Sequence, residues 1–328
     1  MKLSRRYFAQ ILGISGLATT FYPLATKAVN NSQDLQTKII NLFSSLPGQK
    51  AMEVLAIKNN TSWKVSLNPE MSLFCGSSFK VYVLTEFLRQ MEAGKVTFTD
   101  KLSIDDNVRT LSSPVFEELS GKTTALIALE AMMMHSDNTA TDMILHHINP
   151  EKVRQLIEEI GLKNTIIPDS TRIFFSYLLG ADNNIDLGWQ KISQEINNLK
   201  NPTRNIINNR QTMMSSPQDF VNFYAEALQG KFFQKSETLT EFKRILSLPN
   251  IINKFIPEGA LGYVKGGSIS FTPQYALSIA GGVRFSENHW AYYSFLINWD
   301  DSTDKLEPEI ANSFLKSISQ TMTLVMNH

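Results

Sequence analysis

The sequence has few of the features that mark membrane-spanning, disulfide-linked or nucleic-acid-binding proteins. Cys75 is the one cysteine in 328 residues, which excludes an internal disulfide even in an oxidising compartment. Basic and acidic residues number 31 each, and no basic block stands out, so a nucleic-acid partner is not expected. No apolar run is long enough to span a bilayer comfortably. The 43% hydrophobic fraction is instead typical of a globular protein with an ample core.

Residues 1–28 have the composition of an export signal. Arg5 and Arg6 lie in a basic start before Phe8, a mildly apolar run follows, and Ala28 ends a small-residue cleavage site. We predict a twin-arginine signal that is removed in the mature protein, and the alternative is an ordinary amphipathic first helix. Without these residues the chain keeps 27 basic against 31 acidic residues, a net charge of −4. We therefore expect a periplasmic or secreted protein without stable membrane insertion.

Hydrophobic periodicity predicts strands near both ends of the chain and helices between them. The predicted helices are 33–46, 81–92, 123–135, 139–147, 151–160, 220–228 and 307–326, and the predicted strands are 52–57, 62–67, 261–264, 276–285 and 291–299. An Asn-rich segment, residues 183–211, reads as a long connection. We expect a mixed α/β fold in which one antiparallel sheet (about 29–81 and 251–328) is flanked by helices and joined to a mostly helical lobe (about 82–250).

A serine and a lysine three residues apart open the first long helical pattern after the strands. Ser-x-x-Lys is a weak motif, because it occurs three times here: at Ser77, Ser302 and Ser313. Only Ser77 follows a strand and begins a helix, where free backbone N–H groups favour a developing anion. On that helix Ser77 and Lys80 project from one face. The alternative role for Ser77 is a plain helix cap.

Two further motifs follow in an informative order. Ser136-Asp137-Asn138 lies between two predicted helices, where it presents Ser136 and Asn138 to a cleft or simply caps a helix. Lys265-Gly266-Gly267-Ser268 begins on a strand, where glycines allow a ligand to approach the backbone or form a bulge. Taken alone, the motif that begins at Lys265 is better explained by a β-bulge than by a ligand site. All three in this order favour a serine acyl-transfer site with a lysine base.

With these motifs and their surroundings, the chain resembles the class A β-lactamases and the related penicillin-binding proteins over essentially its whole mature length. The resemblance implies a β-lactamase/transpeptidase-like fold with a five-stranded antiparallel sheet. It makes Ser77 the nucleophile and Lys80 the base. Ser136 would pass a proton to the leaving group, with Lys265 beside it to attract a substrate carboxylate.

The resemblance also implies binding groups for the substrate. Asn138 would hold a substrate amide, and Gly267 and Ser268 would line the substrate's path. The backbone N–H groups of Ser77 and Ser268 would form the oxyanion hole, where one donor is typically worth about 100-fold or more in rate.

Three departures concern the chemistry. The segment 167–174, where the family carries a glutamate that activates water for deacylation, holds only Asp169 as an acid. Asp169 is thus the candidate for deacylation, or it caps its own turn. Gly266 stands where the family has a Thr or Ser, and residues 275–280 offer no arginine for a substrate carboxylate. Acylation is therefore expected to be intact and deacylation to be altered.

The sequence leaves three functions open. The first is β-lactam hydrolysis with atypical deacylation, the second an esterase or D-alanyl-D-alanine peptidase, and the third a non-catalytic peptidoglycan-binding relative. We expect a small-molecule substrate, no cofactor and no metal, and a monomer. His146 and His147 adjoin on a helix, but no other residue stands at metal-ligand spacing from them.

Overall fold

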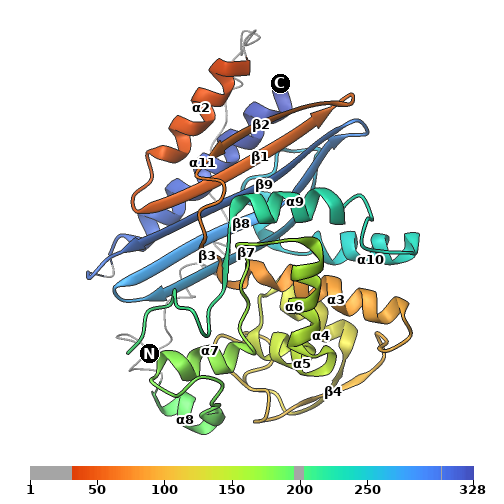
Figure 1. Cartoon of the computed structure of the whole chain (residues 1–328), viewed down its shortest axis with the longest axis vertical. Helices are drawn as coiled ribbons and strands as arrows, with labels where there is room; N and C mark the ends of the chain where they lie inside the picture. Colours follow the sequence, from red (N-terminus) through yellow and green to blue (C-terminus); the bar gives the residue numbers. More distant parts are fainter. Residues whose placement is uncertain (1–31, 196–202, 304) are drawn as a thin grey trace.

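The computed structural model describes residues 32–195, 203–303 and 305–328, so the predicted signal at 1–28 lies outside the described residues (Figure 1). Five strands form one antiparallel sheet in the order β2-β1-β9-β8-β7. They are β1 (Gln49–Lys58), β2 (Thr61–Leu67), β7 (Leu261–Phe271), β8 (Gln274–Ser286) and β9 (His289–Asp300). The predicted mixed α/β fold with this sheet is confirmed.

Local sequence explains the tight connection in the first hairpin. Asn59 and Asn60 have φ values of 50° and 65°, and Lys58 pairs directly with Thr61. Asparagine tolerates this left-handed region better than most residues, and a two-residue turn of this kind matches the twist of the flanking strands. The two predicted strands, 52–57 and 62–67, therefore pair as a hairpin.

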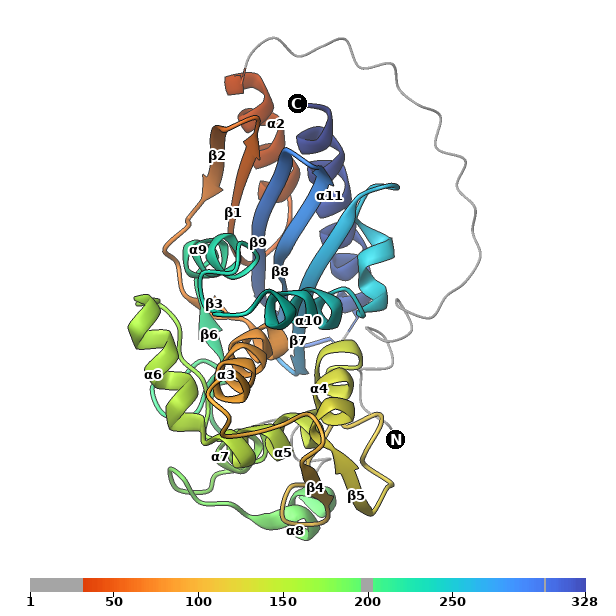
Figure 2. The same cartoon turned by 90° about the vertical axis from the view of Figure 1, so that its right-hand side faces the viewer.

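Two helices cover one face of the sheet. They are α2 (Ser32–Ser44) and α11 (Glu307–Asn327), which lie side by side in Figures 1 and 2. Phe43 of α2 packs against Phe295 of β9 and Phe314 of α11, with ring centroids 5.4 and 6.1 Å apart. This core joins the first and last helices of the described chain to the sheet.

The other face of the sheet packs on α9 (Pro217–Ala227) and on the helical part of the molecule (Figure 2). Tyr82 of the buried helix α3 stacks on Phe220 of α9 with centroids 5.7 Å apart. The helical part contains α3 (Lys80–Glu92), α4 (Ala125–Met134), α5 (Asn138–Ile148), α6 (Pro150–Ile160), α7 (Thr171–Leu178), α8 (Gly188–Glu195) and α10 (Ser236–Leu246). Two small sheets pair β3 (Leu73–Phe74) with β6 (Met214–Ser215) and β4 (Lys101–Ile104) with β5 (Gly121–Thr124).

Several elements differ from the prediction. The Asn-rich segment 183–211, predicted as a connection, contains α8. The predicted strand 261–264 continues to Phe271, because the two glycines that seemed to interrupt it stay in register with β8. Helix α4 starts after Thr124, whose side chain accepts a hydrogen bond from the Ile127 N–H. Within the described residues, no helix has the length and apolarity to cross a membrane.

Candidate active site

The candidate nucleophile lies in a short turn that leads into the buried helix α3. Ser77 belongs to the 3-10 helix η1 (Gly76–Phe79), and Lys80 is the first residue of α3. Gly76 has a φ of 49°, and a Cβ there would lie 2.9 Å from the Ser268 nitrogen. Glycine is required at this position for both its backbone conformation and its close approach to β7. Ser77 itself is buried, with 4% of its surface exposed.

Two buried serines that sequence reasoning missed hold this turn on the sheet. Ser78 Oγ donates to the Lys265 carbonyl at 3.1 Å and lies 2.7 Å from Ser278 Oγ on β8. Ser278 Oγ in turn donates to the carbonyl of Cys75 at 2.5 Å. These bonds join residues about 200 positions apart, so no local pattern indicates them. They fix the height of the Ser77 turn above the sheet.

Gly267 lies directly against the same turn. A Cβ at Gly267 would be 2.1 Å from the Cys75 carbonyl oxygen and 2.6 Å from the Ser77 nitrogen. The sequence left two explanations for the two glycines, the approach of a ligand and a β-bulge. For Gly267 the structure shows the approach of the nucleophile turn instead, while a Cβ at Gly266 would meet the Ser278 oxygen at an ordinary 3.4 Å.

Lys80 joins the nucleophile's helix to the second motif. Its side chain is fully buried, and Nζ donates to the Ser136 carbonyl at 2.8 Å and to Asn138 Oδ1 at 2.7 Å. A second hydrogen bond fixes the orientation of the Asn138 amide, because Nδ2 donates to the Leu111 carbonyl at 2.9 Å. The structure thus brings the first two motifs into direct contact.

The third motif meets the second at Ser136. Lys265 Nζ donates to Ser136 Oγ at 3.0 Å and to the Gly266 carbonyl at 2.8 Å. Ser136 has a φ of 57°, an uncommon conformation for serine of the kind that clusters at functional sites. Asp137 holds the loop in place: it caps α5 and accepts from the Val115 and Phe116 N–H groups at 2.8 and 3.1 Å. The Ser136 hydroxyl, bound by the amine of Lys265, is suited to exchange a proton.

A pocket of about 590 Å³, including the part open to solvent, lies over this constellation. Three of the predicted residues line the pocket: Ser77, Asn138 and Ser268. The other four are connected to these three by the contacts described above: Lys80, Ser136, Lys265 and Gly267. Sequence reasoning missed the polar residues Ser112, Ser270 and Glu307. They come from a loop, from the far end of β7 and from the start of α11, so no shared spacing reveals them.

Asp169, the candidate for deacylation, is engaged elsewhere. One carboxylate oxygen forms an ion pair with Arg154, and the other accepts from Gln211 Nε2 at 2.8 Å. Asp169 is not among the residues that line the pocket. The chain has no glutamate from residue 160 to 193. The structure therefore brings the three motifs together but does not place Asp169 in the lining of the pocket above them.

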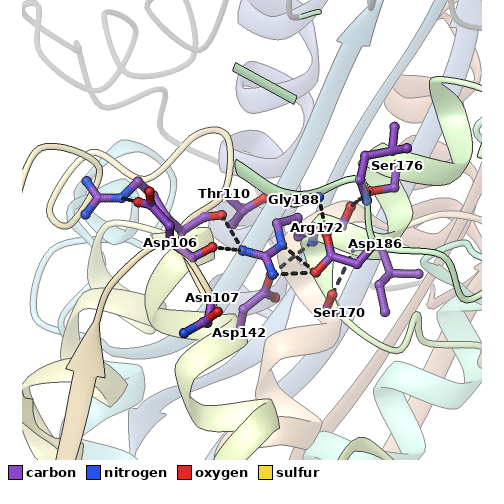
Figure 3. A network of polar contacts seen from close by, with 12 residues as sticks. Asp106, Asn107, Thr110, Asp142, Ser170, Arg172, Ser176, Asp186 and Gly188 are labelled. Carbon is purple, nitrogen blue, oxygen red and sulfur yellow. Dashed lines mark hydrogen bonds and ion pairs between the residues drawn. The ribbon is translucent and has the colours of Figure 1, made fainter. Parts of the chain in front are cut away.

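Helix α7, which borders the pocket, is held by a polar network around Arg172 and Asp142 (Figure 3). Asp142 accepts from the Thr171 and Arg172 N–H groups at 2.7 and 3.0 Å. Burial raises the pKa of Asp142 to about 6, against the opposing effect of these hydrogen bonds. The Arg172 guanidinium pairs with Asp186 and donates to the Asp106 carbonyl at 2.6 Å. These carboxylates fix the position of α7 rather than facing Ser77.

Metal ligation finds no support in the described part of the chain, where no group of three His, Cys, Asp or Glu side chains converges. His147 of the adjacent histidine pair contacts Asp100, with Nε2 and Oδ2 2.9 Å apart. The polar groups described at the site are hydroxyls, amines, the Asn138 amide and the Glu307 carboxylate.

Comparisons with known proteins agree with this arrangement. The sequence profile of the beta-lactamase enzyme family matches residues 34–275. Among curated proteins, none matches the sequence. The fold is similar to PBP-A in a structure of its L158E mutant as an acyl-enzyme complex with penicillin G, at 18% identity and a TM-score of 0.66, covering 89% of this chain and 97% of that one.

Two β-lactamases are similar to the same degree. The chromosome-encoded β-lactamase of Vibrio parahaemolyticus has 19% identity and a TM-score of 0.63, covering 86% of this chain and 98% of that one. The β-lactamase of Sphaerobacter thermophilus DSM 20745 has 13% identity and a TM-score of 0.65, covering 90% and 96%. At these identities the likeness establishes the fold.

Proposed function

Since the chain belongs to the beta-lactamase enzyme family, we propose that it is an exported serine hydrolase that opens β-lactams through an acyl-enzyme on Ser77 and releases the product slowly. One observation carries the proposal: Lys80 and Lys265 bind the same residue, Ser136, from two sides, at 2.8 Å to its carbonyl and 3.0 Å to its hydroxyl. The Ser136 hydroxyl, which accepts a hydrogen bond from Lys265 Nζ, can deliver a proton to a leaving nitrogen.

In the acylation step, Ser77 Oγ forms a bond to the lactam carbonyl carbon as its proton passes to the amine of Lys80. The C–N bond then breaks, and Ser136 supplies the nitrogen's proton, which Lys80 replaces. The backbone N–H groups of Ser77 and Ser268 stabilise the carbonyl oxygen as it becomes negative. Lys265 adds positive charge beside Ser136, where a substrate carboxylate would lie.

Deacylation needs a group that activates water. The residues near α7 give no support for a fast hydrolysis of the acyl-enzyme. The α7 segment offers no glutamate, and Asp169 is bound to Arg154 and Gln211. Without a glutamate in this segment, general base catalysis of hydrolysis loses a contribution of about 100-fold or more. We therefore propose that the acyl-enzyme accumulates.

Intact-mass measurement after addition of benzylpenicillin tests the proposal. We expect one adduct of the whole penicillin within minutes, a decay much slower than its formation, and no adduct in Ser77→Ala. The control is Ser302→Ala, which removes a serine of the same Ser-x-x-Lys spacing and should keep the adduct. No adduct and no turnover of any β-lactam by the unaltered protein would contradict the proposal.

A second function, D-alanyl-D-alanine peptidase or esterase, is favoured by the same missing glutamate. Such an enzyme would turn over a D-alanyl-D-alanine peptide or a p-nitrophenyl ester while its penicillin adduct persists. A non-catalytic binding relative would instead bind its ligand equally well after Ser77→Ala and resist a fluorophosphonate probe.

We also propose export by the twin-arginine route, on the strength of Arg5 and Arg6 in their basic start. Fusion of residues 1–28 to a folded reporter tests it. The reporter should reach the periplasm, and replacing both arginines by lysine should retain it in the cytoplasm.

A further inference from the structure

Helices cover only part of one face of the main sheet. On this face α9 contacts β1, β8 and β9, and α10 contacts β7. Both helices lie toward one end of the strands, and the sheet extends beyond them toward the β8–β9 turn (Figure 2). Directly paired residues of neighbouring strands point to the same face. One paired row crosses all five strands in this extension, and we call it the outer row: Ser62, Ile57, Trp290, Arg284 and Leu261.

Apolar side chains of the outer row remain accessible. Leu261 has 54% of its surface exposed, and Ile57 and Trp290 are partly exposed. The Trp290 ring packs against Tyr263 and Tyr292, with ring centroids 6.0 Å apart in each pair. Trp290 is thus held in place by its neighbours while part of it stays at the surface. Exposed apolar side chains among polar ones are typical of an interaction surface.

Two cations lie beside the tryptophan. Lys243 Nζ of α10 is 5.5 Å from the centroid of the Trp290 ring, and Arg284 Cζ is 6.0 Å from it. In the described part of the chain neither cation forms an ion pair, and Arg284 Nε donates to the Ser286 carbonyl at a long 3.4 Å. Burial, together with the charge of Arg284, lowers the pKa of Lys243. An anion beside the two cations would relieve this repulsion.

The other charges on this face nearly balance. Lys64 of β2 lies opposite Leu55, and its ammonium is 3.5 Å from the buried carboxylate of Glu53. The excess positive charge therefore comes from Lys243 and Arg284. This excess disfavours a second copy of the chain as the partner, because a two-fold interface would place the same two cations against their own counterparts.

The surface calls for a partner that offers negative charge and an apolar layer together. A soluble anionic polymer would satisfy the two cations but leave Leu261 in water. An anionic bilayer offers phosphate groups directly above hydrocarbon. A partly exposed tryptophan suits the boundary between these layers, and the long side chains of lysine and arginine reach the phosphates while their stems stay in apolar surroundings.

We propose that the outer row docks reversibly on an anionic lipid surface through Lys243, Arg284, Trp290 and Leu261. Ser268, which lines the pocket, lies seven residues from Leu261 along β7, or about 23 Å. Docking by the outer row therefore leaves the pocket at the other end of the strand. This inference does not depend on the proposed acyl-enzyme function.

Cosedimentation of the full chain with lipid vesicles tests the proposal. One set of vesicles contains equal parts of phosphatidylglycerol and phosphatidylcholine, and the other contains phosphatidylcholine alone, both in about 0.1 M salt, where charges still act over about 10 Å. We expect binding to the anionic vesicles to be at least about tenfold tighter. Arg284→Gln and Lys243→Gln should each weaken it about fivefold, the effect of one cation near such a surface.

Further variants test the apolar contact and the location. Leu261→Ser should weaken binding about fivefold, because the exposed half of this side chain would leave water on docking. Lys316→Gln is the matched control, since it removes an exposed cation from α11, which covers the opposite face, and it should keep the unaltered affinity. Residues 1–28 carry the same four basic residues in every variant, so differences between variants report on the outer row alone.

Several outcomes would overturn the proposal. Absence of binding to anionic vesicles by the unaltered protein does so without any variant. Equal binding by the unaltered protein and the Arg284→Gln, Lys243→Gln double variant, at an unchanged melting temperature, does so as well. Binding to soluble polyglutamate that matches the vesicles and survives Leu261→Ser would assign the surface to an acidic polymer. A dimer that Arg284→Gln dissociates would assign it to a second copy.

The proposed function fails or stands separately. Penicillin adduct formation should be the same in the unaltered protein and in all the outer-row variants, because none of these residues lines the pocket. Vesicle binding without any adduct would contradict the acyl-enzyme and support the lipid surface. An adduct without vesicle binding would do the reverse.

Discussion

Replacing Gly267 by alanine is the sharpest perturbation that the structure offers. The new methyl carbon would lie 2.1 Å from the Cys75 carbonyl oxygen, 2.6 Å from the Ser77 nitrogen and 2.8 Å from the Ser78 nitrogen. All three neighbours are backbone atoms of the nucleophile turn, so no side-chain rotation relieves the overlap. The turn or the strand must move.

The size of the movement follows from the contact distance. Ordinary contacts of a Cβ begin at 3.4 Å, so the separation from the Cys75 oxygen must grow by about 1.3 Å. A displacement of about 1 Å in a reacting group costs about 100-fold in rate. We therefore expect Gly267→Ala to lower the rate of penicillin acylation by at least about 100-fold, together with a loss of stability of about 1–3 kcal/mol from strain.

Acylation rate by intact mass and unfolding by denaturant measure the two effects separately. Gly266→Ala is the matched control, because a Cβ at the neighbouring glycine would meet nothing closer than 3.4 Å. Its acylation rate should stay within about twofold of the unaltered protein, since no group of the turn has to move. If Gly267→Ala acylates as fast as Gly266→Ala, the packing of β7 against the turn does not position Ser77, and the reasoning is refuted.

Other groups give predictions of their own. Burial raises the pKa of Asp142 from 3.8 to about 6, so the native state binds a proton more tightly than the unfolded state. The free energy of unfolding should therefore fall by about 2 kcal/mol as the pH rises from 4 to 6. Urea titrations of the unaltered protein and Asp142→Asn should diverge with this slope, and parallel curves would contradict it. Burial raises the pKa of the Cys75 thiol, so a thiol reagent should label the protein only after denaturation. Asp169→Asn should lower stability by about 1 kcal/mol through its contacts with Arg154 and Gln211, and a tenfold slower decay of the acyl-enzyme would instead assign it to deacylation.

The sequence predicts those parts of the site whose signal is local. Ser77 and Lys80 are three residues apart at the start of a helix, and Ser136 to Asn138 are consecutive, so the sequence alone places the members of each motif close together. The hairpin at Asn59 and the pairing of β8 with β9 follow from equally local patterns.

The missed parts depend on distant partners. Ser278 holds the nucleophile turn from a strand 200 residues away, and Glu307 reaches the pocket from the start of a helix that otherwise covers the opposite face of the sheet. Neither residue belongs to an unusual local pattern. Helices α7 and α8 have only eight residues each, too few turns for hydrophobic periodicity to distinguish them from a loop.

The pairing of β1 with β9 has a consequence for biosynthesis. Val54 lies opposite Tyr293, which follows 239 positions later in the chain, so β1 cannot pair with β9 until the residues between them have been synthesised. The central strands therefore assemble only after translation of the whole domain, and the platform under Ser77 forms with them. A cell that makes this protein must complete it as an intact polypeptide before it acquires reactivity, and any nonsense codon ahead of the final hairpin yields an inert product.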